Sequence, residues 1–208
     1  QSTDAYGQKR FNDVSTALTA GPEIFFGPSR LNLSAGITRR WFGGDRLTDG
    51  QVAQAILSVP VSSTAQTRLA LTASKVTNHF NPLESGRNYS AGIEIEKALS
   101  LRTGMSLSLS LLRQDLRDEG YSNRSGQLGL VGYRSFGRTT LVASASINRL
   151  VADQRLLLYP EKRNDWTKRL ALGATFRKLE VYGFSPSAQF SWERNGSSIE
   201  IYDYRRRA

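Results

Sequence analysis

Residues 105–113 run MSLSLSLLR, and this short stretch decides the fold. The large apolar side chains fill every second position of residues 105–111, and serine fills the positions between them. Successive side chains of a β-strand point to opposite faces, whereas an apolar stripe on a helix recurs every three or four residues. The stretch therefore predicts a strand with one large apolar face and one small polar face.

The same period of two recurs along the whole chain, for example in Leu31–Ile37, Leu141–Ile147 and Leu170–Phe176. No window of comparable length has helical spacing. We expect strands over 14–26, 30–41, 51–61, 67–78, 88–99, 103–114, 126–136, 139–151, 166–180 and 186–195, and a further strand from near Ile199. Pro22 and Pro60 predict a bulge or a strand end, because proline donates no ladder hydrogen bond. The pattern predicts an all-β antiparallel up-and-down meander of about 10–11 strands.

The expected connections alternate in length. Short turns fall at Gly27–Ser29, Ser62–Gln66, Ser100–Arg102, Gly137–Arg138 and Val181–Ser185. Long polar loops are expected at Phe42–Gly50, His79–Arg87, Asp115–Ser125 and Ala152–Asp165. In an antiparallel meander this alternation predicts tight turns at one end of the sheet and long loops at the other.

Composition excludes several classes of protein. The 208 residues carry a formal charge of +10, with no cysteine and one histidine, His79. A disulfide scaffold, an iron–sulfur cluster and a Cys- or His-rich metal site are therefore excluded. The longest apolar run is Leu156–Tyr159, which is far too short for a transmembrane helix. Apolar residues make up only 39% of the chain, yet their regular spacing argues against disorder.

A transmembrane β-barrel accounts for these features together. Such a barrel has strands of about 9–11 residues with apolar side chains toward lipid, polar ones inside, short periplasmic turns and longer outer loops. Aromatic residues gather near the expected strand ends, among them Phe26, Trp41, Tyr133 and Phe184, as in the girdles of outer-membrane barrels. Cross-strand aromatic pairs in a soluble sheet are the alternative.

One basic residue ends the apolar series on each of five strands that rise toward the long loops. These residues are Arg39, Lys75, Arg113, Arg149 and Arg194. We expect them to form a basic collar that meets the phosphates and carboxylates of lipopolysaccharide at the outer interface, since arginine suits bidentate phosphate contacts. Ordinary snorkelling of long cations to any headgroup is the competing interpretation.

No group of residues predicts catalysis, a cofactor or a metal ion. His79 lies in a loop with no fixed serine partner, and Glu94 and Glu96 share one strand face, where pairing with an inward arginine such as Arg68 is expected. The acidic residues 115–119 lack the glycine-punctuated spacing of a calcium loop. Arginines recur along the strands without a dense patch, so we expect no nucleic-acid partner.

The C-terminal region carries a recognisable series of motifs. Gly183-Phe184-Ser185-Pro186 is followed by Arg194-Asn195-Gly196-Ser197 and then by Tyr202-Asp203-Tyr204-Arg205-Arg206. In this order and spacing they resemble the barrel domain of the surface lipoprotein assembly modifier family, in which a G-F-x-P turn, an R-N-x-S element and a terminal Y-D-Y-x-R strand follow one another. Residues 39–44 and 157–160 add to the likeness.

The resemblance implies an outer-membrane barrel of about fourteen strands, preceded by periplasmic helical repeats, that helps lipoproteins reach the surface of a Gram-negative bacterium. A client surface lipoprotein is the implied partner, beside outer-membrane lipid. A passive porin-like channel for small solutes is the alternative function, and a soluble all-β binding domain is a third possibility. The chain shows no signal peptide, no helical repeats and no terminal aromatic residue. We therefore expect residues 1–208 to form one β-barrel domain, a fragment that lacks strands at one or both ends.

Overall fold

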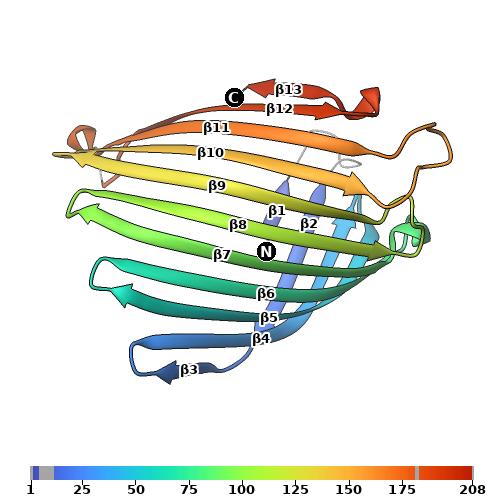
Figure 1. Cartoon of the computed structure of the whole chain (residues 1–208), viewed down its shortest axis with the longest axis horizontal. Coiled ribbons are helices and arrows are strands. Elements are labelled where there is room, and N and C mark those ends of the chain that lie inside the picture. Colours follow the sequence, from blue (N-terminus) through green and yellow to red (C-terminus); the bar gives the residue numbers. More distant parts are fainter. Residues whose placement is uncertain (1, 5–11, 181–182, 208) are drawn as a thin grey trace.

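The alternating segments form one antiparallel sheet in the computed structural model, which describes residues 2–4, 12–180 and 183–207. Its strands are β1 (Ser2–Asp4), β2 (Asp13–Ala20), β3 (Glu23–Phe26), β4 (Ser29–Phe42), β5 (Asp45–Ser62), β6 (Ala65–Asn78), β7 (Gly86–Ser100), β8 (Thr103–Leu116), β9 (Asn123–Phe136), β10 (Thr139–Ala152), β11 (Asn164–Phe176), β12 (Ser187–Ser197) and β13 (Tyr204–Arg207). Each strand pairs with its neighbour in the sequence, except that β4 pairs with both β2 and β3 (Figure 1). The predicted all-β up-and-down meander is confirmed.

The two prolines act as predicted. The expected strand 14–26 divides at Pro22 into β2 and β3, which lie along different parts of β4. Pro22 still accepts a hydrogen bond through its carbonyl oxygen from the backbone N–H of Leu33, at 3.0 Å. At Pro60 the register between β5 and β6 shifts, which marks an irregularity in the ladder.

The prediction of a long loop at Phe42–Gly50 is wrong. β4 continues to Phe42, a two-residue turn follows, and β5 begins at Asp45. Gly43 and Gly44 have φ angles of 64° and 98°, which only glycine adopts at little cost, and two such residues form a tight hairpin turn. Residues 45–50 are mostly polar, and all but Leu47 pair with the end of β4, so they form a strand without an apolar pattern.

Two C-terminal boundaries also differ from the expected ones. β11 ends at Phe176 instead of residue 180, because the 3-10 turn η3 (Arg177–Leu179) begins there. The strand expected from near Ile199 begins only at Tyr204, after the 3-10 turn η4 (Glu200–Tyr202). Residues 181 and 182 of the expected Val181–Ser185 turn lie outside the described residues.

The two ends of the sheet are unlike. Two-residue turns at 27–28, 63–64, 101–102 and 137–138 lie together at the left in Figure 1. The connections 79–85, which contains η2 (Pro82–Glu84), 117–122 and 153–163 lie at the opposite end. The predicted alternation is therefore confirmed for these connections. It fails at the Gly43–Gly44 turn of the long-loop end and at residues 177–186, where the predicted short turn is a ten-residue connection at the short-turn end.

The sheet has two different faces and no apolar core. Leucine, isoleucine and other apolar side chains on one face are largely exposed, and small polar side chains on the other face are half-buried. Among the described residues only two apolar side chains, Ala152 and Ile199, are buried. The accessible surface is 14,586 Å², whereas a soluble monomer of 23.1 kDa exposes about 9,700 Å². Such a sheet requires an apolar medium on its outer face.

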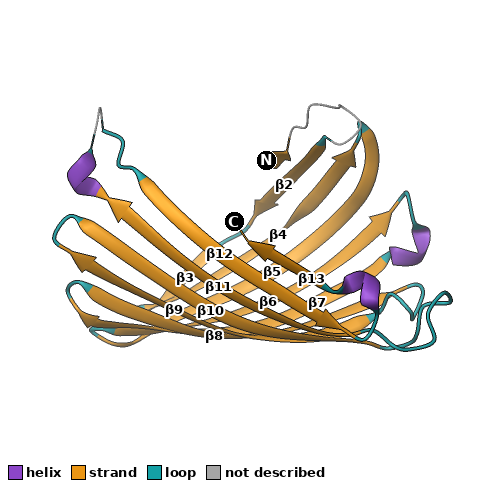
Figure 2. Ribbon diagram, turned by 90° about the horizontal axis from the view of Figure 1, so that it is seen from above, coloured by secondary structure: helices purple, strands orange, loops and turns teal. Residues whose placement is uncertain are grey.

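The sheet curves into an open trough (Figure 2). Because the exposed apolar side chains splay outward and the polar ones crowd together, the apolar face is the convex one. The sheet does not close, since β1 and β13 stand at the two ends of the strand order. None of the described helices, which are single 3-10 turns, is long and apolar enough to cross a bilayer.

Candidate functional site

The five predicted basic residues all lie on the convex face, at one position in each strand that rises toward the long loops. Arg39, Lys75, Arg113 and Arg149 each stand ten residues after the first residue of β4, β6, β8 and β10. Arg194 stands seven residues after the first residue of β12. We call these five residues the basic row.

Register and tilt place the basic row at one level. Through β5, Lys75 lies opposite Ile37, two residues before Arg39, and through β7, Arg113 lies opposite Ala73, two residues before Lys75. This shift of about one residue per strand is the stagger of a tilted barrel sheet. Ten residues span about 33 Å of strand, which at the usual tilt of about 35–45° corresponds to the roughly 25 Å height of an outward apolar band.

Members of the basic row differ in what they contact. Arg113 pairs with Asp153, with 2.7 Å between Nη1 and Oδ1 and 2.6 Å between Nη2 and Oδ2. Arg39 donates through Nε to Asp49 at 3.0 Å. Arg149 lies over a girdle ring, with its Cζ 5.3 Å from the ring centroid of Trp166. No salt bridge within the described residues includes Lys75, Arg149 or Arg194.

Further outward cations were not predicted, and two of them, Lys168 on β11 and Arg205 on β13, lie opposite Arg194. Arg87 on β7 lies opposite Lys75, and Arg124 on β9 lies opposite Arg113. Both side chains are exposed, and neither forms a salt bridge with another described residue. The sequence holds the signal for both, because each begins the outward series of a strand that descends from the long loops.

The concave face carries small polar side chains and a few charged pairs. Arg68 Nη1 donates to Glu94 Oε2 at 3.2 Å, as expected, and Gln66 donates to Glu96 on the same two strands. Farther along the sheet Glu193 accepts hydrogen bonds from Arg169 and Tyr204. Each of these contacts joins side chains of two neighbouring strands. Glu94 and Glu96 therefore form cross-strand side-chain pairs.

The family-motif residues build the corner where β12 turns into β13. Asn195 is 3% exposed; its Oδ1 accepts from Thr167 Oγ1 at 2.6 Å and its Nδ2 donates to the carbonyl of Tyr202 at 2.8 Å. Asp203 Oδ1 accepts from the backbone N–H of Ser197 at 2.8 Å. Ser197 Oγ in turn donates to Asp165, which is also buried. These contacts fix a chain reversal.

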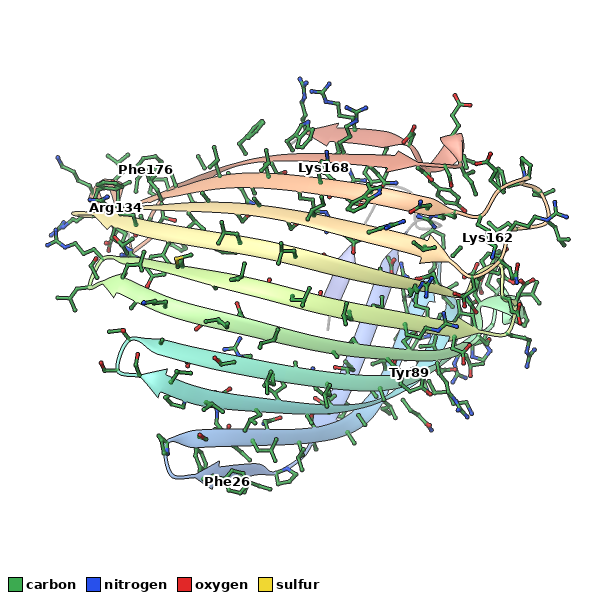
Figure 3. All side chains as sticks on the ribbon, in the orientation of Figure 1. Phe26, Tyr89, Arg134, Lys162, Lys168 and Phe176 are labelled. Carbon is green, nitrogen blue, oxygen red and sulfur yellow. The ribbon has the colours of Figure 1, made fainter. Side chains whose placement is uncertain are left out.

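The other motif residues are spread over both ends of the sheet. Gly183 has a φ angle of 80°, and Phe184 is 79% exposed near the short-turn end. The carbonyl oxygen of Pro186 accepts from the N–H of Phe176 at 2.9 Å. Arg206 lies opposite Glu193 on the concave face. Figure 3 shows Phe176 at this end of the sheet and Tyr89 toward the long-loop end.

The loop residues considered for chemistry are engaged in local contacts. His79 Nε2 lies 2.5 Å from Asp49 Oδ2, so the ring belongs to a charge cluster that includes Arg39 and Arg46. Asp118 Oδ1 accepts from the N–H of Gly120 at 2.7 Å. Across the described part of the chain, no three His, Asp or Glu side chains come together as a metal site.

Comparison with known proteins then settles the family. The family model described as "Surface lipoprotein assembly modifier" matches residues 2–208. The chain belongs to this family. With the convex apolar band, family membership identifies the sheet as wall of an outer-membrane β-barrel.

No curated protein matches the chain. Among solved structures, a KdgM porin in complex with disordered oligogalacturonate matches with a TM-score of 0.45 and 10% sequence identity. The match covers 95% of this chain and 90% of the porin chain.

Proposed function

We propose that this family member forms the barrel wall of an outer-membrane protein that helps lipoproteins to cross, or emerge at, the surface of a Gram-negative bacterium. The observation that carries the proposal is the family match over residues 2–208. The proposed partner is a client surface lipoprotein, and the proposed action is transport without covalent chemistry.

The concave face supports this role physically. Serine, glycine, threonine and asparagine dominate it, and its few charges are paired across strands. A face of this kind offers many weak hydrogen-bonding positions and little apolar surface. A largely unfolded or extended client segment would slide along it without a deep energy minimum.

Deletion of the gene in its native host tests the proposal. Surface lipoproteins are labelled on intact cells with a membrane-impermeant reagent and compared by mass spectrometry before and after deletion. We expect one or a few lipoproteins to lose surface labelling while their total amount stays unchanged, and the full-length gene to restore labelling. Unchanged labelling of every lipoprotein would overturn the proposal.

A passive porin-like channel is the second candidate, favoured by the small polar side chains of the concave face. A channel of this kind gives steady single-channel conductance in planar bilayers when the full-length protein is inserted without any client. Conductance combined with normal lipoprotein labelling in the deletion strain would favour the channel. Client-dependent labelling without conductance would favour the assembly role.

We also propose the basic row as a collar for the outer leaflet. The row stands at the long-loop end of the apolar band, which faces the cell exterior in outer-membrane barrels. Arginine and lysine there would face the phosphates and carboxylates of lipopolysaccharide.

A further inference from the structure

A groove on the convex face leads to a cationic part of the outer rim. It has a volume of about 850 Å³ and is almost wholly apolar. Ala35, Ala53 and Ala73, which lie opposite one another on β4, β5 and β6, form its floor, and Leu33 and Leu71 stand beside them. At its far end the groove meets Tyr89 and Arg113.

The groove climbs through the apolar band. Ala35 lies four residues below the basic row on β4, Ala73 lies two residues below it on β6, and Arg113 belongs to the row. From β4 to β8 the groove crosses four strand spacings, about 19 Å. One leaflet contributes about 15 Å of the hydrocarbon core, so an acyl chain fits along this path.

Four cations surround the upper end of the groove. Lys75 on β6 lies opposite Arg87 on β7, and Arg113 on β8 lies opposite Arg124 on β9. Each of these two cross-strand pairs consists of like charges. Like charges directly opposite in a sheet are destabilising unless something neutralises them. We call these four residues the cation cluster.

Nearby carboxylates neutralise only part of the cation cluster. Arg113 pairs with Asp153, and its Nη2 lies 3.8 Å from Asp115. No salt bridge among the described residues involves the other three cations. The cluster therefore keeps an excess of positive charge, and Arg113 keeps further N–H groups, because a guanidinium has five and the Asp153 contact uses two.

We propose that the groove and the cation cluster together form a seat for one phosphorylated, acylated lipid of the outer leaflet, of the lipid A type. An acyl chain lies along the alanine floor, and a phosphate is held among Lys75, Arg87 and Arg124. The apolar groove meets the excess positive charge of the cation cluster at the level where the phosphates of outer-leaflet lipid lie. The seat rests on the outer-leaflet collar proposed above and does not depend on the lipoprotein role.

Native mass spectrometry of the full-length protein in detergent, titrated with lipid A, tests the seat. The variant Lys75→Gln/Arg87→Gln/Arg124→Gln removes three cations and leaves the pair between Arg113 and Asp153 intact. We expect it to bind the first lipid A molecule about tenfold more weakly, because phosphate contacts are charge-assisted. The matched control Arg102→Gln/Arg134→Gln/Arg138→Gln removes the same charge at the short-turn end of the sheet and should change binding less than about twofold.

A second variant keeps the test valid if the charge variant fails to fold. Ala73→Phe fills the groove without changing charge, and Ala145→Phe places the same side chain elsewhere on the convex face. We expect only Ala73→Phe to weaken lipid A binding, and folding is checked by heat-modifiable migration on gels. Equal losses in the two charge variants, or equal binding of dephosphorylated lipid A or phosphatidylglycerol, would overturn the seat.

Discussion

At the scale of single residues, the pair between Arg113 and Asp153 joins the rim of the sheet to its longest described loop. Arg113 stands near the end of β8, and Asp153 opens the connection between β10 and β11. The side-chain hydrogen bond from Arg113 lowers the pKa of Asp153 below its ordinary value of 3.8, and the fields of Arg124 and Lys162 act in the same direction. The carboxylate therefore stays ionised throughout the physiological range.

This pair predicts a pH-dependent loss of stability. The folded-state pKa of Asp153 is depressed, so its contribution is present above pH 3.8 and is lost as the pH falls through the lower folded value. We expect Asp153→Asn to lower the thermal midpoint in detergent by no more than about 4 °C near neutral pH. The difference from the unmodified protein should shrink below pH 3.8.

Thermal unfolding followed by circular dichroism across this pH range checks the prediction. Asp45→Asn is the matched control, because Asp45 forms no salt bridge among the described residues. The difference in thermal midpoint between Asp153→Asn and the unmodified protein is compared at each pH. If this difference stays constant into strong acid, stability does not depend on the ionisation of Asp153, and the prediction is contradicted.

At the scale of elements, the corner between β12 and β13 depends on side-chain hydrogen bonds more than on its short ladder. β13 has four residues and pairs with β12 only over Trp192–Asn195. Asn195 joins Thr167 on β11 to the carbonyl of Tyr202, so one side chain connects three segments. Its burial explains why the motif demands a particular side chain there.

Asn195→Ala should therefore release the corner. It leaves the buried Thr167 hydroxyl and the Tyr202 carbonyl without their partner, which costs about 1–3 kcal/mol of unfolding free energy. Hydrogen exchange should rise first in residues 200–207, and denaturant unfolding should give the size of the loss. Arg194→Ala, at the exposed neighbouring position, should change stability much less, and equal losses in the two variants would count against the corner.

The elements also show what sequence can predict for a sheet of this kind. Alternation located β6 to β10 well, because an apolar face must meet lipid over the membrane span. Residues 45–50 extend β5 beyond the basic row and carry no such pattern, so only the Gly43–Gly44 turn and backbone pairing reveal them as strand. The basic row followed from the sequence for the same reason, whereas the contact from Arg113 to Asp153 depends on how a loop folds back.

At the scale of the whole molecule, the basic row repeats one position from strand to strand and is not a single site. Each rising strand from β4 to β12 contributes one cation at nearly the same level, and the four that stand ten residues into their strands span β4 to β10. The charges therefore surround the wall instead of forming one patch. Their common position indicates a shared constraint, which the outer-leaflet headgroups would supply.

Replacement of all five basic-row residues with glutamine should weaken retention of lipopolysaccharide by the purified full-length protein. Each cation near an anionic membrane surface contributes about 1 kcal/mol, so we expect a loss of at least severalfold. Lipopolysaccharide that co-purifies after extensive detergent washing is measured by its phosphate and sugar content. Five exposed cations elsewhere, Arg30, Arg102, Arg134, Arg138 and Arg177, serve as the control set, and equal losses would leave only general charge attraction.

The ten-residue spacing also matches the sheet to bilayers of one thickness. An apolar height of about 25 Å is less than the roughly 30 Å hydrocarbon core of an average bilayer, and bacterial outer membranes are thinner than average. A thicker bilayer would cover the basic row and would have to thin around the wall. The same spacing that positions the cations therefore favours thin membranes, and insertion should be most efficient in vesicles of short-chain lipids.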